Sequence, residues 1–131
     1  MGETALVESQ IEDSIKLIKR MDQGEYKPSK AFWYYHDDVD TWRLVLVGDK
    51  FNDMLPKQEP LAYKIIADLL NGEDMSTLSI SDIKLMKSTE PLIATLNFLI
   101  GTGPDGIVRA NFNSTTINGI FIKEMVILRS A

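Results

Sequence analysis

The sequence contains no cysteine, and this absence removes several classes of site at once. Without thiols the chain forms no disulfides, iron–sulfur clusters or thiolate zinc sites, and it has no cysteine nucleophile. His36 is the single histidine, so a multi-histidine zinc site cannot form within one chain and a serine triad is disfavoured. A Walker loop, a nucleophile elbow and an HExxH motif are also missing. We therefore expect no cofactor and favour a non-catalytic protein.

Long apolar runs are missing as well. No stretch approaches the roughly 18 apolar residues of a membrane-spanning helix. The acidic, polar N-terminal segment does not resemble a secretory signal. We expect a cytoplasmic protein without membrane association. The net charge of −5 disfavours broad binding to nucleic acid, although a local basic patch would leave that partner open.

The residues that are present are typical of a globular protein. Apolar residues make up 44% of the chain and charged residues 25%. A length of 131 residues predicts one domain, 1–131, large enough to bury about two-thirds of the surface that the unfolded chain exposes. Within it we place an N-terminal amphipathic helix in residues 1–24, and a sheet with its helices in residues 31–131.

Apolar periodicity and turn signals predict the element order α-ββ-α-β-α-ββ. The most economical arrangement is an α+β fold, with a five-stranded mixed or mainly antiparallel sheet and helices packed mainly on one face. The turn of the last hairpin lies at Asn113-Ser114 or at Asn118-Gly119, and the sequence leaves both open. The predicted helices are 4–23, 60–70 and 88–100, and the predicted strands are 31–35, 41–47, 82–86, 107–112 and 120–129.

Side chains alternate across a strand, so each predicted strand assigns its residues to one of two sheet faces. The first face is almost uniformly apolar and is expected to lie under the helices. Glu124 interrupts it, and a bulge near Lys123-Glu124 would remove the conflict. The apolar residues of this first face are Trp42, Leu44, Leu46, Ile83, Leu85, Val108, Ala110, Phe112, Ile120, Ile122, Val126 and Leu128.

The second face is half apolar and basic in a protein that is acidic overall, and it holds three of the four arginines. Uncovered apolar patches mark contact surfaces, so we predict a binding or accessory module that self-associates or docks a protein partner here. In one alternative, the N-terminal helix or loops cover this face and local acids pair with its arginines. In another, the face binds an anionic ligand or nucleic acid. The predicted anchors are Arg43, Arg109 and Arg129, with Phe121, Met125 and Ile127, and Lys84 shares their parity.

The loop between the first two strands, residues 36–40, clusters one imidazole and three carboxylates. Hard cations take such oxygens, so a metal-dependent hydrolase or nuclease built on this loop is an alternative function. The loop lacks the glycine and the final glutamate of an EF-hand, however, and carboxylate-rich hairpin loops are usually only solvated. Our first expectation is therefore that no metal binds. The ligands in the alternative would be His36, Asp37, Asp38 and Asp40.

Two further motifs are interpreted as structure. Residues 101–106 match G-x-G-x-x-G, but the dinucleotide fingerprint needs a strand before it and a helix after it. Here the predicted helix precedes and the predicted strand follows, so we expect a helix cap and a turn. The aromatic run Phe32 to Tyr35 could stack a base or a ring, but packing in the core and across strands is the commoner use.

Three segments carry a recognisable pattern of strands, caps and turns. They are Trp-Arg-Leu-Val at 42–45, Asp-Ile at 82–83 followed by Ser-Thr-Glu-Pro-Leu, and the Thr-Ile-Asn-Gly segment that leads into the strand closing on Arg129. Together they resemble a group of small bacterial proteins of unknown function and of about this length. The resemblance covers roughly residues 31–131 and implies a shared fold unit and a bacterial origin. It implies no activity, cofactor or site.

Overall fold

The computed structural model describes residues 6–71 and 75–131. No helix within these ranges is long and apolar enough to cross a membrane. Short 3-10 turns at Asp37–Val39 and Ile80–Asp82 accompany the main elements. The helices are α1 (Glu8–Asp22), α2 (Asp49–Met54), α3 (Glu59–Leu70) and α4 (Pro91–Leu96), and the strands are β1 (Lys30–His36), β2 (Thr41–Val47), β3 (Ile83–Leu85), β4 (Ala110–Ile117) and β5 (Ile120–Ser130).

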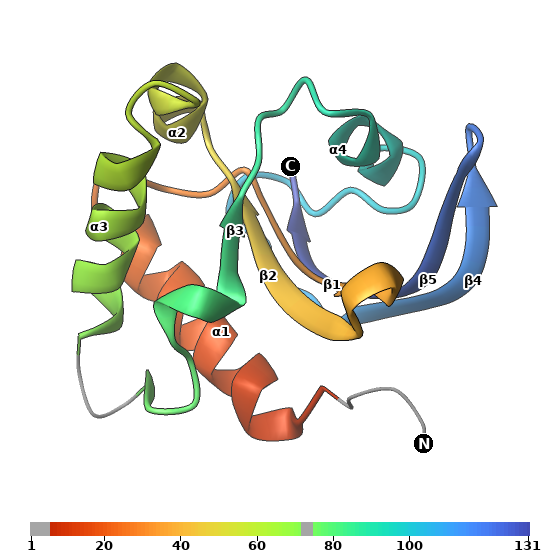
Figure 1. The fold of residues 1–131 in the computed structure, drawn as a ribbon, viewed down its shortest axis with the longest axis horizontal. Helices are drawn as coiled ribbons and strands as arrows, with labels where there is room; N and C mark the ends of the chain where they lie inside the picture. The colour runs from red at the N-terminus through yellow and green to blue at the C-terminus, as the bar shows by residue number, and fades with distance from the viewer. Residues whose placement is uncertain (1–5, 72–74) are drawn as a thin grey trace.

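The five strands form one mixed sheet in the order β3-β2-β1-β5-β4. β2 and β3 run parallel, and every other neighbouring pair runs antiparallel. The predicted α+β class and five-stranded mixed sheet are therefore confirmed. β5 is the last strand along the chain, but it lies inside the sheet between β1 and β4 (Figure 1).

Three of the helices, α1, α2 and α3, cover one face of the sheet (Figure 1). α1 packs through buried residues at three- and four-residue steps, as its amphipathic pattern predicts. Trp33 of β1 lies in this first core, where its indole N–H donates to the Ser14 hydroxyl at 2.8 Å. That hydroxyl in turn donates to the Gln10 carbonyl oxygen at 2.6 Å, so the buried polar groups are satisfied.

One helix was not predicted, and another is shorter than predicted. α2 lies in the stretch expected to be a simple connection, because six residues are too few to show a period. Phe51 anchors it by full burial and by stacking on Tyr26, with ring centroids 5.4 Å apart. α4 is shorter than predicted, beginning at Pro91 and ending at Leu96, and hydrogen-bonded turns continue the chain to Ile100.

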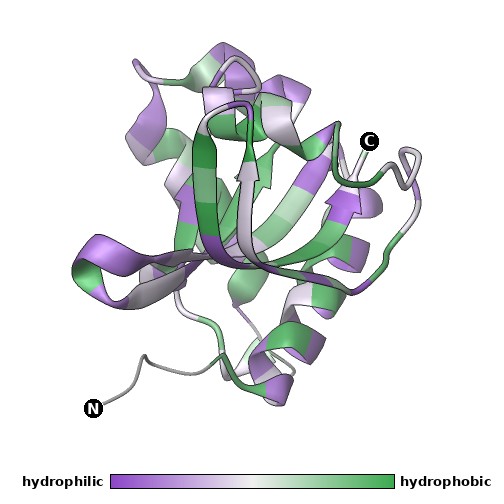
Figure 2. Cartoon of the chain, turned by 90° about the vertical axis from the view of Figure 1, so that its right-hand side faces the viewer, coloured by the Kyte–Doolittle hydropathy of each residue, from purple (hydrophilic) through white to green (hydrophobic). Residues whose placement is uncertain are grey.

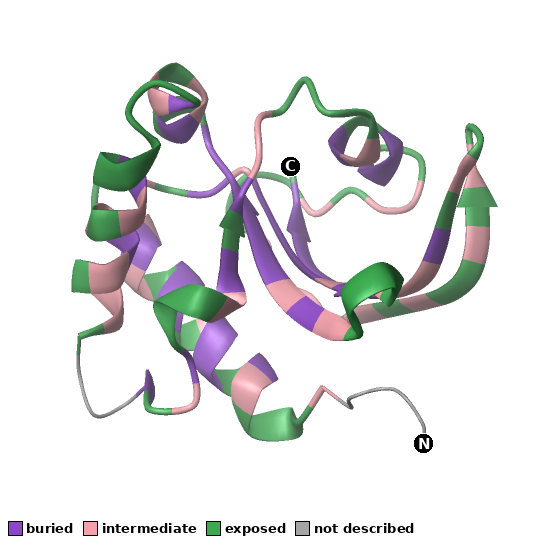
Figure 3. Ribbon diagram, viewed as in Figure 1, coloured by how far each residue is buried: buried purple, intermediate pink, exposed green. Residues whose placement is uncertain are grey.

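A second core lies on the opposite face of the sheet, under α4. Phe32 of β1 belongs to this core and its neighbour Trp33 to the first, so β1 is buried on both sides. The predicted packing role of the aromatic run is confirmed for Phe32, Trp33 and Tyr35, which are all buried. Figure 3 shows buried residues along the middle strands, with exposed residues on the outer sides of the helices and on the β4–β5 hairpin.

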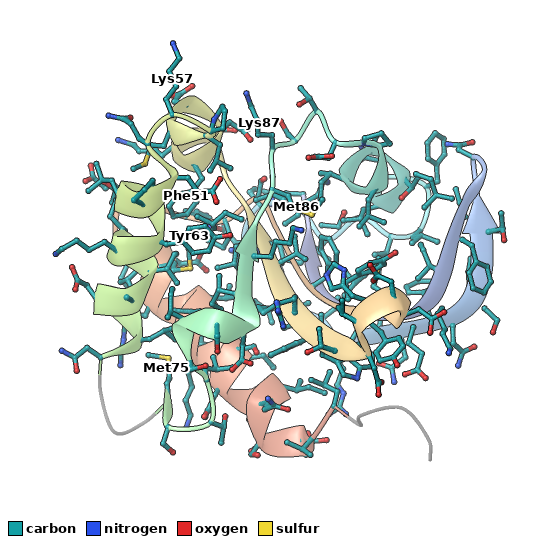
Figure 4. All side chains as sticks on the ribbon, in the orientation of Figure 1. Phe51, Lys57, Tyr63, Met75, Met86 and Lys87 are labelled. Atoms are coloured by element: carbon teal, nitrogen blue, oxygen red, sulfur yellow. The ribbon has the colours of Figure 1, made fainter. Side chains whose placement is uncertain are left out.

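The outer edge of β3 is closed by the protein itself. Tyr63 lies on the side of α3 that faces this strand (Figure 4), and its hydroxyl oxygen accepts from the Leu85 N–H at 2.9 Å. The N–H of Ile83 donates to the Ile80 carbonyl oxygen of the preceding turn. Both N–H groups therefore have partners within the chain, which blocks pairing with another strand at this edge.

The β4–β5 hairpin resolves the two turn positions that the sequence left open. Asn118 and Gly119 form the two-residue turn with φ of 51° and 79°, as a type I′ turn requires. At the other position, Ser114 has φ of 46° within β4. The β4–β5 hairpin bends towards the side of the sheet on which α4 lies (Figure 1). In Figure 2 the β5 side of the arm is largely apolar and the β4 side is pale and more polar.

This curvature corrects the predicted assignment of faces. Ile122 and Met125 both lie in the second core although they are three residues apart, so the alternation breaks at Lys123-Glu124 without any change in the β4–β5 register. The register shift that a bulge produces occurs elsewhere in β5, where Leu128 is left without a partner in β1. The residues predicted for the first face but found against the second core are Ala110, Phe112, Ile120 and Ile122.

Candidate functional site

The six residues predicted to anchor a partner do not form one open surface. Met125 and Ile127 are 1% and 0% exposed in the second core, and Arg129 is 0% exposed. The prediction is wrong for these three residues. α4 and the segments beside it cover Met125 and Ile127 on the second face. Arg129 pairs with Ala31, a residue of the first core, because the register shift at Leu128 breaks the alternation along β5. Loop covering of this face was one of the alternatives that the sequence left open.

Arg129 is a structural residue. Its guanidinium makes two hydrogen bonds to the Asp22 carboxylate at the end of α1, at 2.7 and 2.8 Å. It also donates to the carbonyl oxygens of Pro28, Asp105 and Gly106. A buried guanidinium needs this number of acceptors because each unsatisfied donor would be costly away from water. Arg129 therefore holds the end of α1 and the 105–106 loop against β5.

The three remaining anchors lie on separate parts of the molecule. Phe121 is 57% exposed near the tip of the β4–β5 hairpin. Arg109 is exposed just before β4 and pairs with Glu8 of α1. Arg43 lies on β2, which β1 and β5 separate from β4 in the sheet. Arg43 lines a pocket.

This pocket, which we call the Arg43 pocket, has a volume of about 200 Å³ and lies on the part of the second face that α4 leaves uncovered. Adjacent strands supply its polar groups: His36 from β1, Thr41 and Arg43 from β2, and Lys84 from β3. The pairings of Thr41 with His36 and of Lys84 with Val45 place these residues at neighbouring positions of the sheet. Asp38 and Val39 of the hairpin loop complete the lining.

The cations of the Arg43 pocket have no carboxylate partner within the described ranges. The Arg43 guanidinium donates to the Thr41 hydroxyl oxygen at 3.1 Å, but neither Arg43 nor Lys84 forms an ion pair there. Asp38 contributes one carboxylate to the lining without reaching ion-pair distance of either cation. The pocket therefore carries two positive charges against one negative charge, in a protein of net charge −5.

The imidazole of His36 forms one side of the pocket. Its Nε2 atom is buried and has no hydrogen-bond partner among the described residues. Burial lowers the pKa of the imidazole, and Lys84 and Arg43 lower that pKa further, while Asp38 opposes them. The ring contacts Tyr34 edge to face, with centroids 5.0 Å apart and planes at 84°. The neutral imidazole therefore lies beside the two cations with one buried nitrogen that the described residues do not use.

The acidic loop does not gather its side chains as the metal alternative would require. Asp37 pairs with Lys123 at 3.0 Å, and Asp40 accepts a hydrogen bond from the Tyr35 hydroxyl. Asp38 and His36 line the Arg43 pocket instead, next to the two cations. Across residues 6–71 and 75–131, no group of three such side chains is placed to hold a metal ion.

A larger hollow of about 320 Å³ lies near the start of β1 and α2 and makes a useful contrast. Its two lysines are already paired, because Lys27 bonds to Asp105 and Lys50 bonds to Glu25 at 3.3 Å. Pro28 and Pro104 add apolar lining. We favour the smaller Arg43 pocket as the functional site because its charges are not neutralised by the protein itself.

The sequence identified part of this site. Arg43, His36 and Asp38 were all candidates, but they were assigned to two unrelated hypotheses. Lys84 shares the parity of Arg43, and this was the signal that could have brought it into the site. Thr41 gave no signal, because a threonine at the start of a strand is ordinary.

Comparisons with protein-family models, with curated proteins and with solved structures find no match to this chain. The resemblance to a group of small bacterial proteins stays a prediction. The functional conclusion therefore rests on the geometry of the pocket.

Proposed function

We propose that the protein is a binding module for a small anionic ligand, held in the Arg43 pocket. The observation that carries this proposal is that Arg43 and Lys84 line one small pocket without a carboxylate partner among the described residues. Clefts lined by charges of one sign focus the electrostatic field and attract ions of the opposite sign, so two cations in one pocket favour an anionic ligand. The sequence analysis left an anionic ligand open as one alternative, and the present proposal assigns that ligand to Arg43 and Lys84.

The electrostatics favour binding over a purely structural role. Two like charges facing the same partly enclosed space repel one another, and the repulsion is stronger there than in bulk water because the local dielectric constant is lower. A bound anion would replace the repulsion between the two cations by attraction to both. It would also accept charge-assisted hydrogen bonds from the guanidinium of Arg43 and the ammonium of Lys84.

The experiment is a calorimetric titration with inorganic phosphate at low and at high ionic strength. We expect binding that weakens as salt is added, because the contacts are largely electrostatic. Arg43→Gln and Lys84→Gln should each weaken it at least about tenfold, which corresponds to the loss of one hydrogen bond to a charged group. Lys50→Gln is the matched control, because Lys50 is an exposed lysine paired with Glu25 at the other hollow. Equal affinities in all three variants would overturn the proposal.

Self-association is a second candidate function, and the open edge of β4 favours it. Residues 110–122 carry no charge, so β4 lacks the lysines that usually protect an edge strand. Ile117 and Ile120 flank the two-residue turn and exchange backbone hydrogen bonds with each other. In an antiparallel pair, hydrogen-bonded and non-hydrogen-bonded positions alternate, so the N–H and C=O of Thr116 point away from β5, towards the open edge of the sheet. Phe121, opposite Thr116 on β5, is exposed beside this edge. Antiparallel pairing of β4 with a second copy would satisfy these groups.

Solution mass tests this second candidate. We expect a dimer by light scattering after size-exclusion chromatography, which persists at high salt because the edge is uncharged. Thr116→Pro removes the outward donor, and a proline is tolerated on an edge strand where the N–H faces solvent, so the monomer should still fold. A wild-type protein that is monomeric at high concentration would contradict the candidate, as would a Thr116→Pro variant that remains dimeric.

A further inference from the structure

We infer that the ligand of the Arg43 pocket is a small phosphate monoester that carries a hydroxyl group next to its phosphate. This inference rests on the proposed anion binding and narrows it to a chemical class. It follows from three observations: the spread of the donors, the position of Asp38 and the size of the pocket.

The charged donors come from two adjacent strands. Arg43 and Lys84 lie on β2 and β3, and neighbouring strands are about 4.8 Å apart. Groups spread in this way approach an anion from different directions. A tetrahedral phosphate presents three terminal oxygens that can accept from separate directions, whereas a carboxylate presents two oxygens in one plane. The arrangement therefore favours a phosphate group.

Asp38 argues against a bare anion. Its carboxylate lines the same pocket and would repel a phosphate placed against it. The same carboxylate accepts hydrogen bonds well, so a hydroxyl group on the ligand would turn the repulsion into an attraction. The Asp38 side of the pocket thus suits a hydroxylated carbon, while the side of Arg43 and Lys84 suits the phosphate.

The size of the pocket limits the rest of the ligand. The pocket volume of about 200 Å³ is several times the roughly 30 Å³ that one water molecule occupies. The pocket can therefore hold a molecule larger than a single small ion. It is smaller than the ~300–1,000 Å³ of sites for drug-sized ligands, so it suits a small molecule. Val39, at 63% exposure beside the opening, offers an apolar contact to a short carbon chain. A polyol phosphate of about three carbons fits these limits.

The test compares two matched compounds and one carboxylate by calorimetry. Glycerol 3-phosphate and propyl phosphate have the same chain and the same anionic group, but only the first carries hydroxyls. We expect the wild-type protein to prefer glycerol 3-phosphate roughly tenfold, the effect of one hydrogen bond to a charged acceptor. Glycerate, which replaces the phosphate by a carboxylate, should bind more weakly than either.

Asp38→Ala isolates the hydroxyl contact. In this variant we expect the two phosphate esters to bind equally, with propyl phosphate gaining affinity because the repelling carboxylate is gone. Asp37→Ala is the control, since Asp37 pairs with Lys123 and not with the pocket cations. That variant should keep the wild-type preference.

The outcomes separate the inference from the function on which it rests. Tight phosphate binding with no preference for the hydroxylated ester would overturn the inference alone, as would glycerate binding as well as the esters. Absence of binding by every anion would overturn the proposed function as well. A preference that survives Asp38→Ala would also count against the inference, because another group would then be recognising the hydroxyl.

Discussion

Arg129 and Asp22 form a two-pronged ion pair, with Nη1–Oδ1 and Nη2–Oδ2 distances of 2.7 and 2.8 Å. The arginine is fully buried on β5, while the aspartate closes α1 at the surface. The pair joins the two ends of the described chain, since its partners are 107 residues apart in sequence. A contact of this kind specifies how α1 docks on the sheet.

Breaking this pair should destabilise the fold strongly. Asp22→Ala would leave a buried guanidinium without its counterion, and losing one partner of a buried pair typically costs about 3–5 kcal/mol. We expect a lower urea midpoint with an unchanged slope. Arg109→Ala is the matched control, because its ion pair with Glu8 is exposed and such pairs contribute little. If the two variants unfolded at the same urea concentration, Arg129 would not be the structural residue described above.

The buried hydrogen bond between Trp33 and Ser14 makes a second prediction. Ser14→Ala would leave the indole N–H of a fully buried tryptophan without a partner, which costs about 1–3 kcal/mol. Thermal unfolding followed by tryptophan fluorescence should show the loss. The control is Ser9→Ala, one helical turn nearer the N-terminus and exposed on the same helix. Because alanine has a higher helix propensity than serine, the control should show no loss, and a loss of the same size in the control would contradict this prediction.

The tight turn of the β4–β5 hairpin predicts a difference between two glycines. Gly119 has φ of 79°, so Gly119→Ala should cost about 1–2 kcal/mol of stability because an L side chain is strained there. Gly101 has no positive φ, and an added Cβ would meet no atom within 4 Å. Gly101→Ala should therefore be tolerated. Chemical denaturation of both variants measures the difference, and equal stabilities would contradict the turn assignment.

His36 predicts a pH dependence of known sign. Its pKa in the folded protein lies below the ordinary value of 6.5, so the unfolded chain binds more protons than the folded chain between these two pKa values. Stability should therefore fall as the pH drops below about 6.5, the unfolded pKa of histidine, and should be unaffected by this group above it. His36→Gln should remove this contribution.

The same residue allows a direct measurement, because it is the only histidine and its NMR signals need no further assignment. We expect Lys84→Gln to raise the pKa of His36, since Lys84 is one of the charges that lowers it. The Lys50→Gln control should leave the His36 pKa unchanged. A phosphate bound in the Arg43 pocket should raise it in the wild-type protein. A titration curve that is the same in all of these samples would show that the Arg43 pocket is not electrostatically coupled to His36.

The fold was largely predictable because its signals are local. Alternation and turn residues predicted the first hairpin at 31–35 and 41–47, where the structure has β1 and β2, and the Asn118-Gly119 turn was one of two options. The faces of β4 and of the first part of β5 were not predictable by parity. Ala110 and Phe112 follow Ile127 and Met125, with which they pair, to the second face. Ile120 and Ile122 join them because the alternation breaks opposite Ser114, whose positive φ a serine rarely adopts.

The candidate site was predictable only in fragments. Sequence patterns indicate which side of a strand a residue occupies, but they do not show how far a covering helix extends. α4 buries Met125 and Ile127 and leaves Arg43 open, and this division depends on where a short helix lies across the sheet. Arg129 resembled an exposed anchor because its partner, Asp22, is distant in sequence.

The position of β5 inside the sheet has a consequence for the biosynthesis of the protein. Lys30 of β1 pairs in register with Ser130 of β5, a residue 100 positions later. On the ribosome β1 therefore emerges long before the strand that covers its second edge. Until β5 arrives, that edge and the apolar side chains beside it stay open, and contacts this distant in sequence form slowly. We expect the nascent chain to complete its sheet late, and to be most prone to aggregation in the interval before β5 is synthesised.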